Sequence, residues 1–210
     1  MPEQTLLIAT HNAGKMREYA EIFAGLRLRL MSLAEAGIGW PAEETGATFE
    51  ENARLKAAAY CAASGLLTLA DDSGLEVDAL NGEPGVQSAR YAGASATFAE
   101  RIRLLLARLN GVPPSRRRAR FRCVIAIAQP GGSVLTAEGV CEGEIGFEPR
   151  GEGGFGYDPI FFLPQYGQTM AELPSAEKHR ISHRGKAAAA ARLMLERLAR
   201  EEANPFDTLT

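Results

Sequence analysis

The chain has 210 residues, of which 46% are hydrophobic and 23% charged, and its formal net charge is −3 at pH 7. This composition is typical of a soluble globular protein with a sizeable core, and the charge does not indicate nucleic acid or an anionic membrane as a partner. The N-terminal segment does not resemble a signal peptide, and no apolar run approaches the roughly 20 residues of a membrane span. The three cysteines match no metal-binding spacing, so we expect free thiols in a cytoplasmic protein.

Strand-like and helix-like segments alternate in the first half of the chain. Thr48 and Glu51 have the spacing of a capping box, and Gly65 stands where the helix that they open should end. Short apolar runs bounded by polar residues predict buried strands, and the third run should end where Asp71 begins. The predicted strands are residues 6–10, 28–33 and 66–70, and the predicted helices are 15–23 and 48–65.

The second half predicts a helix, a hairpin and a final helix. Thr97 and Glu100 form another capping box, which opens an amphipathic helix that stops at Asn110. Two strand-like runs, 121–128 and 134–142, flank a Pro-Gly-Gly turn and predict a hairpin. The Ala-rich run 185–200 predicts a long helix, and we expect the polar tail 201–210 to be loose. Together these elements indicate an α/β fold with a mixed sheet, in one domain over residues 1–210.

The segment GEGGFGYDP, residues 151–159, contains the GxGxxG spacing of a dinucleotide-binding turn. Such a fingerprint follows a strand and opens a helix, with an acidic residue about 20 positions further on. Here Pro159 comes three residues after the last glycine, and residues 160–163 are typical of a strand. Glu172 lies at a suitable distance after the glycines, but it does not support a dinucleotide site when no helix follows them. We therefore expect residues 151–159 to form a loop that does not bind a dinucleotide.

The segment THNAGK, residues 10–15, lies between a predicted strand and a predicted helix. A loop in this place offers free backbone N–H groups and the positive end of a helix dipole, and Lys15 adds a cation, which together suit a polyphosphate. It is not a P-loop, because GxxxxGK[ST] would need Gly at Ala9 and Ser or Thr at Met16. An ordinary strand-to-helix turn with a solvated lysine is the alternative.

Two adjacent carboxylates, Asp71 and Asp72, follow the third apolar run. Ligands collect at the carboxyl ends of strands in α/β sheets, and Mg²⁺ takes one or two carboxylates together with substrate phosphates. A carboxylate there could also take a proton from an attacking water, although Asp, Ser and Gly equally favour a simple turn. Glu44 could join a metal site, whereas Glu51 fits the helix cap and the role of Lys56 stays open.

The segment EKHRISHRGK, residues 177–186, gathers six residues that are or can be cationic just before the long helix, which Ser182 could cap. Opposite a triphosphate these side chains would neutralise charge and donate hydrogen bonds, and a simple basic surface is the alternative. His183 could act as an acid or base, or only bind.

A second basic segment, RRRARFR at residues 116–122, could contact nucleic acid. It leads directly into an apolar strand, however, and a charged sheet edge that discourages strand pairing explains it as well. We favour the structural interpretation and expect no nucleic acid partner.

Each of these motifs is weak alone, but their order along the chain is specific. THNAGK, ETGATFEENARLKA, LADDSGLEVDALNGEPGVQSARYAG, GGFGYDPIF and EKHRISHRGKA follow one another between residues 6 and 187. In this the chain resembles the inosine triphosphate pyrophosphatase family, whose members remove non-canonical purine nucleoside triphosphates. The resemblance implies Mg²⁺-dependent hydrolysis of ITP, dITP and XTP to the monophosphate and pyrophosphate, which prevents their incorporation into nucleic acids.

The resemblance also implies roles for individual residues. Asp72 matches the general base, Glu44 and Asp72 match the metal carboxylates, and Ser73 matches a substrate contact. The phosphate-binding loop corresponds to Thr10, His11, Asn12, Ala13, Gly14 and Lys15. The nucleobase segment corresponds to Phe155, Gly156, Tyr157 and Asp158, and further nucleotide contacts correspond to Lys178, His183 and Arg184. The implied fold is an elongated mixed sheet with helices on its faces and two lobes, with the active site in the cleft between them and usually a homodimer.

The sequence departs from the family in two places. His179 stands where many relatives carry Asn, and His11 occupies a variable position of the loop. A site that selects a 6-oxo purine needs a donor aimed at O6, because a site built for one hydrogen bond rejects analogues that lack it. The candidates are His183, Arg184 and backbone N–H groups near Phe155, whose ring could stack on the purine or belong to the core.

Three other functions stay open on the sequence alone. A nicotinamide-dependent oxidoreductase rests only on the GxGxxG spacing, and a non-enzymatic nucleotide- or nucleic-acid-binding module rests on the arginine-rich segment. A hydrolase of damaged pyrimidine nucleotides is a closer rival to the purine enzyme, and a panel of nucleotides would separate the two.

Overall fold

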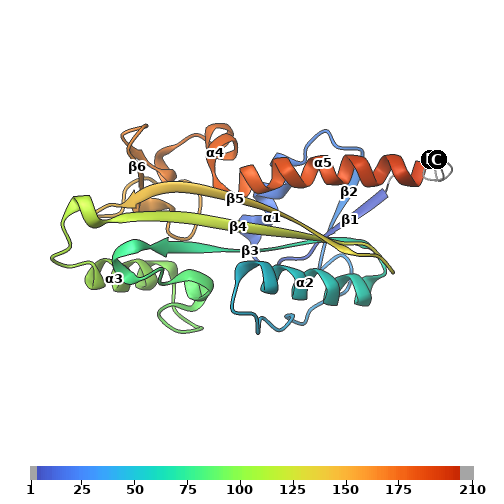
Figure 1. Ribbon diagram of the computed structural model, residues 1–210, viewed down its shortest axis with the longest axis horizontal. Coiled ribbons are helices and arrows are strands. Elements are labelled where there is room, and N and C mark those ends of the chain that lie inside the picture. The colour runs from blue at the N-terminus through green and yellow to red at the C-terminus, as the bar shows by residue number, and fades with distance from the viewer. Residues whose placement is uncertain (1–3, 204–210) are drawn as a thin grey trace.

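The computed structural model describes residues 4–203, and its side chains are described as far as Leu198. Within this range the chain forms a long sheet with helices on both faces (Figure 1). The strands are β1 (Gln4–Ile8), β2 (Leu28–Ser32), β3 (Leu67–Val77), β4 (Arg118–Ala128), β5 (Val134–Ile145), β6 (Phe161–Leu163) and β7 (Gln168–Thr169). The helices are α1 (Ala13–Ile22), α2 (Phe49–Ser64), α3 (Phe98–Arg108), α4 (Ser175–Ile181) and α5 (His183–Ala203).

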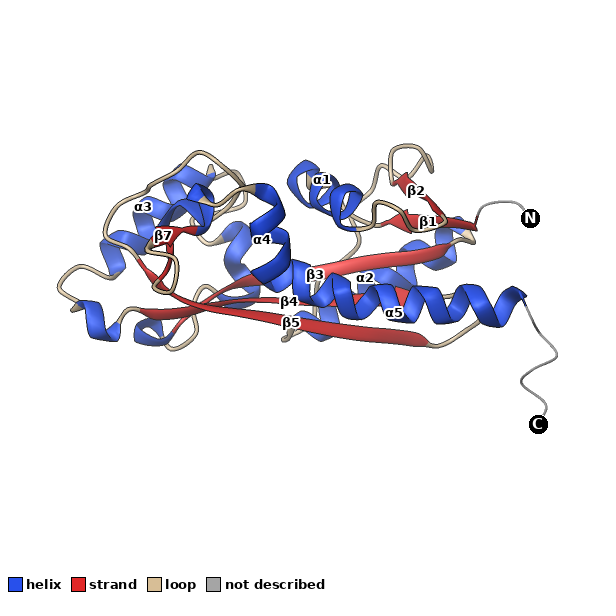
Figure 2. Cartoon of the chain, turned by 90° about the horizontal axis from the view of Figure 1, so that it is seen from above, coloured by secondary structure: helices blue, strands red, loops and turns tan. Residues whose placement is uncertain are grey.

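The sheet is mixed and has the strand order β2-β1-β3-β4-β5-β6-β7. β1 pairs in parallel with β2 and with the start of β3, whereas β3, β4, β5, β6 and β7 follow one another in antiparallel pairs. The predicted α/β class with a mixed sheet and a β4–β5 hairpin is confirmed. Three long strands, β3, β4 and β5, run the length of the molecule and join its two ends (Figures 1 and 2).

Helices cover the sheet unevenly. α5 packs along β4 and β5 on one face, and α2 packs on β3 and β4 on the other (Figure 1). One buried cluster lies between the sheet, α1 and α5, a second lies under α2, and a third lies at the opposite end between α3 and the ends of the long strands. The clusters under α5 and under α2 lie at the same end of the sheet. The cluster beside α3 lies at the other end of the long strands.

The two predicted capping boxes are present. The Thr48 hydroxyl accepts from the Glu51 N–H while Glu51 caps the Thr48 N–H, and Thr97 and Glu100 repeat the arrangement at α3. α2 ends at Gly65, whose φ of 68° is the left-handed conformation that glycine adopts without strain. Local sequence therefore sets the ends of these helices.

Three predictions about secondary structure are wrong. β3 does not end at Asp71 but continues to Val77, because β4 pairs with it along its whole second half. The arginine-rich segment is no sheet edge, because β4 lies between β3 and β5. The expected tail begins too early, since α5 continues through Ala203, and residues 204–210 of that tail lie outside the described residues. The short helix α4 was not predicted from the sequence.

Candidate active site

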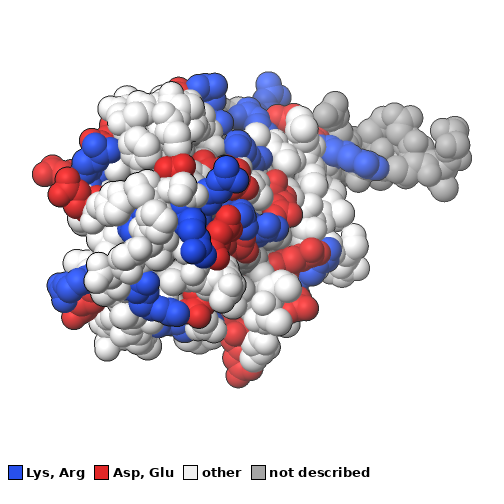
Figure 3. All heavy atoms as spheres, turned by 60° about the vertical axis from the view of Figure 1, so that its left-hand side comes forward, with Lys and Arg blue, Asp and Glu red and all other residues white. Residues whose placement is uncertain are grey.

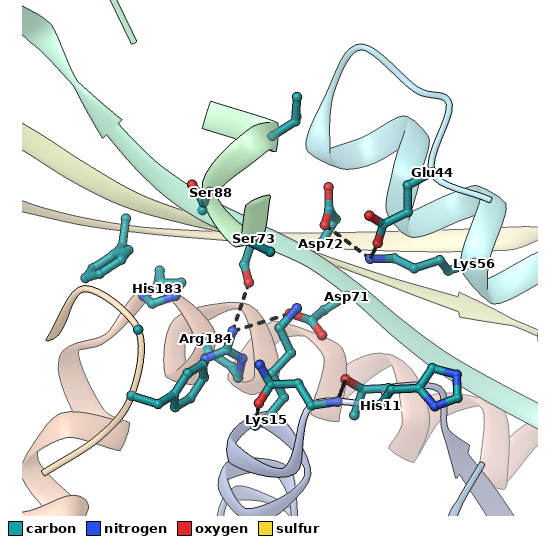
Figure 4. Close-up of a pocket in the computed structure, with 18 of the residues that line it drawn as sticks. His11, Lys15, Glu44, Lys56, Asp71, Asp72, Ser73, Ser88, His183 and Arg184 are labelled. Atoms are coloured by element: carbon teal, nitrogen blue, oxygen red, sulfur yellow. Dashed lines mark hydrogen bonds and ion pairs between the residues drawn. The ribbon is translucent and has the colours of Figure 1, made fainter. Parts of the chain in front are cut away.

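A cavity of about 370 Å³ opens beside the middle of β3. Its walls come from the β1–α1 loop, the segment before α2, the residues before β6, and the α4–α5 junction (Figure 4). Of the predicted site residues, all but two line it, namely Thr10, His11, Asn12, Lys15, Glu44, Asp72, Ser73, Phe155, Gly156, Tyr157, Asp158, Lys178, His183 and Arg184. Ala13 and Gly14 do not line it.

The geometry of β3 places Asp71 and Asp72 at this cavity. β1 pairs with β3 only as far as Leu69, so beyond that residue one side of β3 has no neighbouring strand. Because side chains alternate along a strand, Asp71 points toward α1 and α5 and Asp72 points toward α2. Both residues are less than a tenth exposed, so each carboxylate needs charged or hydrogen-bonding partners.

Asp72 and Glu44 share one cation on the α2 side. The Lys56 ammonium lies 3.1 Å from an Asp72 oxygen and 2.7 Å from a Glu44 oxygen (Figure 4). Burial raises the pKa of Asp72 above its ordinary value of 3.8, and the neighbouring Glu44 adds to the rise, although Lys56 and Lys15 oppose it. Burial alone would lower the pKa of Lys56, but its carboxylate neighbours raise it, so Lys56 stays an ammonium ion.

Three polar residues of α2 form one stripe toward the cavity. Asn52, Lys56 and Tyr60 follow one another at four-residue spacing, which places them on one helix face. Asn52 donates to Asp72 at 3.2 Å, and the Tyr60 hydroxyl accepts from the Ala42 N–H at 2.8 Å. The stripe holds the segment that carries Glu44 against β3. The four-residue spacing of these polar residues in an otherwise Ala-rich helix could have indicated a functional face. The sequence analysis did not identify Asn52 or Tyr60.

Asp71 forms the ionic centre on the other face of β3. Lys15 lies 2.9 Å from Asp71 Oδ2, and Arg184 lies 3.5 Å from the same oxygen. Burial alone would raise the pKa of Asp71, but Lys15, Arg184 and Lys56 together lower it well below its ordinary range. Asp71 Oδ1 is buried and has no hydrogen-bond partner among the described residues. The carboxylate is thus a fixed negative charge that orients two cations.

The β1–α1 loop is built around Asn12. Its side chain caps α1 by accepting from the Gly14 N–H at 2.8 Å and the Lys15 N–H at 3.2 Å, and the Asn12 N–H donates to Thr10. These N–H groups are therefore engaged within the loop, contrary to our expectation that they would be free. Of the features that were expected to suit a phosphate, the helix dipole and the Lys15 ammonium remain.

Glu18, on α1, anchors two cations from the α4–α5 junction. Its two oxygens lie 2.6 Å from the Lys178 ammonium and 2.6 Å from the Arg184 guanidinium. Burial would raise the pKa of Glu18, but Arg184 and Lys178 outweigh it and lower the pKa. Lys178 also lies 2.7 Å from Asp158, so four charged side chains form one buried network. Sequence reasoning missed Glu18, because nothing in its helix distinguishes it from a solvated acid.

His183 is a neutral part of the cavity wall. Its ring stacks on Phe121 with centroids 4.7 Å apart, and it is 5% exposed. Burial, with the nearby charges of Arg184 and Lys178, lowers the pKa of His183 well below 6.5. A neutral imidazole has one N–H donor and one acceptor nitrogen, so the ring could take part in hydrogen bonds at the cavity wall. Ser73, beside it, accepts from Arg184 at 2.9 Å.

Phe155 is a half-buried aromatic face at the cavity and not a core residue. The Lys178 ammonium lies 5.2 Å from its ring centroid and the Arg184 guanidinium carbon 5.3 Å from it. A Cβ on Gly14 would lie 2.7 Å from the ring, so glycine at this position lets Phe155 pack against the first turn of α1. The Phe155 N–H donates to Asp158 at 2.8 Å, which removes it from the predicted donors to a purine O6.

The GxGxxG segment is a loop, as predicted. A short 3₁₀ turn, Asp158–Ile160, and then β6 follow it, and no helix begins there. Gly154 has a φ of 69°, and a Cβ on it would lie 2.1 Å from Asp158. Glycine is therefore required at position 154 by the close approach of the Asp158 side chain.

The arginine-rich segment is accounted for by structure. Arg120 and Arg122 are half-buried on β4 and pair with acids of β3 and β5. Arg117 is buried and donates to the carbonyls of Leu109, Ile145 and Gly146. On the face shown in Figure 3, basic and acidic side chains are interspersed. Within the described residues, no helix is long and apolar enough to span a membrane.

Comparison with known proteins gives one consistent result. The model of the Ham1 family matches residues 6–193. This chain belongs to the Ham1 family. It is 52% identical over 193 residues to the dITP/XTP pyrophosphatase of Desulforamulus reducens, covering 92% of this chain and 96% of that protein. It is 51% identical to the dITP/XTP pyrophosphatase of Bacillus subtilis, covering 86% of this chain and 91% of that protein.

Solved structures of Ham1 proteins share the fold. The Ham1 protein of Coxiella burnetii has a TM-score of 0.84 and 44% identity, covering 92% of this chain and 99% of that one. The Staphylococcus aureus Ham1 protein has a TM-score of 0.82 and 42% identity, covering 92% and 98%. The resemblance to nucleoside triphosphate pyrophosphatases inferred from the ordered motifs is therefore confirmed for this Ham1 chain.

Proposed function

We propose that this Ham1-family chain hydrolyses non-canonical purine nucleoside triphosphates (ITP, dITP and XTP) to the monophosphate and pyrophosphate. The observation that carries the proposal is the cavity itself, where two carboxylates on the α2 side face a cationic network on the α1 side (Figure 4). Such a division suits a polyanion held beside a proton acceptor. The names of the relatives, dITP/XTP pyrophosphatases at about half identity, support the purine assignment.

The donor set also supports a divalent metal, which we propose to be Mg²⁺. Glu44 and Asp72 reach one common point, because both contact the Lys56 ammonium. Among the described residues no group of three or more His, Cys, Asp or Glu side chains could hold a metal ion. Two carboxylates completed by substrate phosphates are the usual environment of Mg²⁺ in phosphoryl-transfer sites, so the residues fit. Bound there, Mg²⁺ would neutralise phosphate charge and orient substrate and water.

Asp72 is the group that accepts the proton of the attacking water in this proposal. Its raised pKa makes it a stronger base than a free aspartate. Asn52 and Lys56 fix both of its oxygens, at 3.2 Å and 3.1 Å, so the carboxylate keeps one orientation. Lys15, at the start of α1, binds the phosphates, and its contact with Asp71 holds its ammonium at the cavity.

The nucleobase would lie against Phe155. Lys178 and Arg184 stand beside its ring, and both are positioned by Glu18. These cations and the single N–H of neutral His183 are the donors available to a purine O6. An adenine amino group at that place would meet donors instead of acceptors, which accounts for selection against it.

Further parts of the proposal concern the whole molecule. We propose that residues 1–210 act as one two-lobed domain, that the protein is a cytoplasmic homodimer, and that neither nucleic acid nor a membrane is a partner. The long strands β3, β4 and β5, which reach from the α2 end to the α3 end, support the first point (Figure 2). The acidic partners of Arg120 and Arg122 support the absence of nucleic acid.

A substrate panel with product identification tests the proposal. Purified protein with Mg²⁺ is incubated with ITP, XTP, dITP, dATP, dGTP and damaged pyrimidine nucleotides. We expect the first three to turn over fastest and pyrophosphate to be the first product. Equal rates on the standard nucleotides would contradict the specificity, and orthophosphate as first product would contradict the bond that is cleaved. Titration with NADH and with a labelled oligonucleotide at stated salt separates the remaining alternatives.

A further inference from the structure

The segment between β2 and α2 carries Glu44 without any regular structure to hold it. Residues 39–48 contain neither helix nor strand, and their backbone groups must be fixed by other means. Side chains of α2 do this on both sides of Glu44. The Ala42 N–H donates to the Tyr60 hydroxyl at 2.8 Å, and the Gly46 N–H donates to the Asn52 carboxamide at 2.8 Å.

The Tyr60 hydroxyl has a second connection, to the phosphate-binding loop. It donates to the Trp40 carbonyl at 3.3 Å, and His11 Nε2 lies 3.2 Å from the same carbonyl and 3.4 Å from the hydroxyl. The contacts are compatible when His11 is the Nε2–H tautomer, whose single N–H is shared between the Trp40 carbonyl and the Tyr60 oxygen while the phenol donates its own proton to that carbonyl. The loop that precedes Glu44 is thereby tied to the loop that follows β1.

Packing holds the hydroxyl in place. Tyr60 is 2% exposed, and the Trp40 indole stacks on its ring at 5.0 Å with an interplanar angle of 25°. The ring of His11 meets its edge at 6.4 Å. A buried phenol about three turns into a regular helix cannot follow a moving loop, so the loop takes its position from the phenol.

We propose that Tyr60 is a positioning residue for the metal-site carboxylate Glu44. Its hydroxyl fixes Ala42, two residues before Glu44, and with His11 joins this segment to the phosphate-binding loop. Tyr60 itself touches neither Glu44 nor Asp72 through a hydrogen bond; it acts through the backbone. The inference rests on the metal site of the proposed function, because the positioning matters only if Glu44 binds a cation.

The test is the full-length Tyr60→Phe variant, which removes the hydroxyl and keeps the ring. Tyr166→Phe is the matched control, because Tyr166 also uses its hydroxyl on side chains but lies far along the chain, beside Glu177 and Arg180. The first readout needs no metal: hydrogen exchange of residues 39–48. The second is Mn²⁺ affinity by calorimetry, supported by the fluorescence of Trp40, the single tryptophan of the chain.

We expect Tyr60→Phe to speed exchange at the Ala42 amide and to weaken Mn²⁺ binding by about tenfold, the lower end of the range for groups that orient metal ligands. The KM for the metal–nucleotide complex should rise more than kcat falls, and Tyr166→Phe should behave as wild type.

Glu44→Gln separates the two proposals. If it weakens Mn²⁺ binding while Tyr60→Phe changes neither exchange nor affinity by more than twofold, the inference about Tyr60 is overturned and the metal site stands. If Glu44→Gln leaves Mn²⁺ affinity unchanged, the metal site of the proposed function is wrong and the role of Tyr60 falls with it.

Discussion

The Lys56 ammonium lies 3.1 Å from a carboxylate oxygen of Asp72, and each of the two residues is less than a tenth exposed. An adjacent ammonium normally lowers the pKa of a carboxylate, yet the pKa of Asp72 is raised. Burial and the repulsion of Glu44 outweigh Lys56. The pair therefore combines a fixed orientation with a basicity that an exposed ion pair would not have.

Replacing Asp72 with Asn should abolish most of the turnover. The carboxamide is of the same size but cannot accept the proton of water, and general-base catalysis is worth about 10²–10⁴ in rate. We expect kcat for ITP to fall within or beyond that range while circular dichroism and the melting temperature show a folded protein. Turnover close to wild type would remove Asp72 from the mechanism.

The pH dependence of kcat/KM should have no limb from His183 near neutrality. Burial and the nearby charges of Arg184 and Lys178 lower the pKa of His183 well below 6.5, so its ring stays neutral over the range in which a free histidine titrates. Rates on ITP measured between pH 4 and 8 check this statement. A limb near 6.5 that disappears in His183→Gln would show that the histidine titrates.

Replacing Lys15 with Ala should weaken substrate binding more than turnover. Lys15 brings its ammonium to the start of α1, where the phosphates are proposed to lie, and it is not in contact with Asp72 or Glu44 through an ion pair. We expect KM for ITP to rise at least about tenfold, which corresponds to about 1.4 kcal/mol. Initial rates over a range of ITP concentrations provide the measurement, and an unchanged KM counts against the phosphate contact.

Replacing Glu18 with Gln should destabilise the protein and disturb base recognition together. The change leaves Lys178 and Arg184 buried with less compensation, and breaking a buried ion pair costs about 3–5 kcal/mol. Glu21→Gln, one turn later on the same helix, is the control, because its carboxylate is exposed. Urea unfolding should show a much larger loss of unfolding free energy for Glu18→Gln than for Glu21→Gln.

The effect of Glu18→Gln on the free energy of unfolding should depend on pH. The folded pKa of Glu18 is lowered from 4.5, so its stabilisation is fully present above the unfolded value and is lost as the pH falls through the folded value. The difference between wild type and Glu18→Gln should therefore shrink below about pH 4.5. A difference that stays constant down to pH 3 would contradict the assigned charge state.

Replacing Arg117 with Ala should lower stability without touching the site. Its guanidinium donates to three backbone carbonyls, and the loss of these three hydrogen bonds should cost about 3 kcal/mol in total. Its neighbour Arg116 is exposed, so Arg116→Ala is the natural control. A melting temperature that drops only for Arg117→Ala, with unchanged KM for ITP, is the expected result. Equal behaviour of the two variants would contradict a structural role.

Sequence reasoning located the helices better than the strands. Helix caps such as Thr48 and Glu51 involve residues only three apart, so they can be recognised in the sequence. The length of β3 is set by its pairing with β4, about 50 residues further along the chain. A polar pair such as Asp71 and Asp72 is typical of a turn. Only the pairing with β4 and the ionic partners on both faces keep these residues in an extended strand.

The site was predictable to the extent that its residues form motifs. The segments around Lys15, Asp72 and Lys178 are contiguous and recognisable, and the fold brings them to one cavity. Glu18 and Tyr60 could not be found in the same way, because their importance comes from partners more than 15 residues distant, and their own neighbourhoods are those of ordinary helices. Such supporting groups appear only when the packing of helices on the sheet is known.

Helix α1 has a consequence for substrate length. Its N-terminal turn carries Lys15, the proposed phosphate contact, and Glu18, one turn later, holds the Lys178 ammonium beside Phe155. Three residues of helix rise about 4.5 Å, so one rigid rod fixes the separation between the two ends of the site. A ligand can therefore contact both ends of the site only if the distance between its charged part and its aromatic part matches this fixed separation.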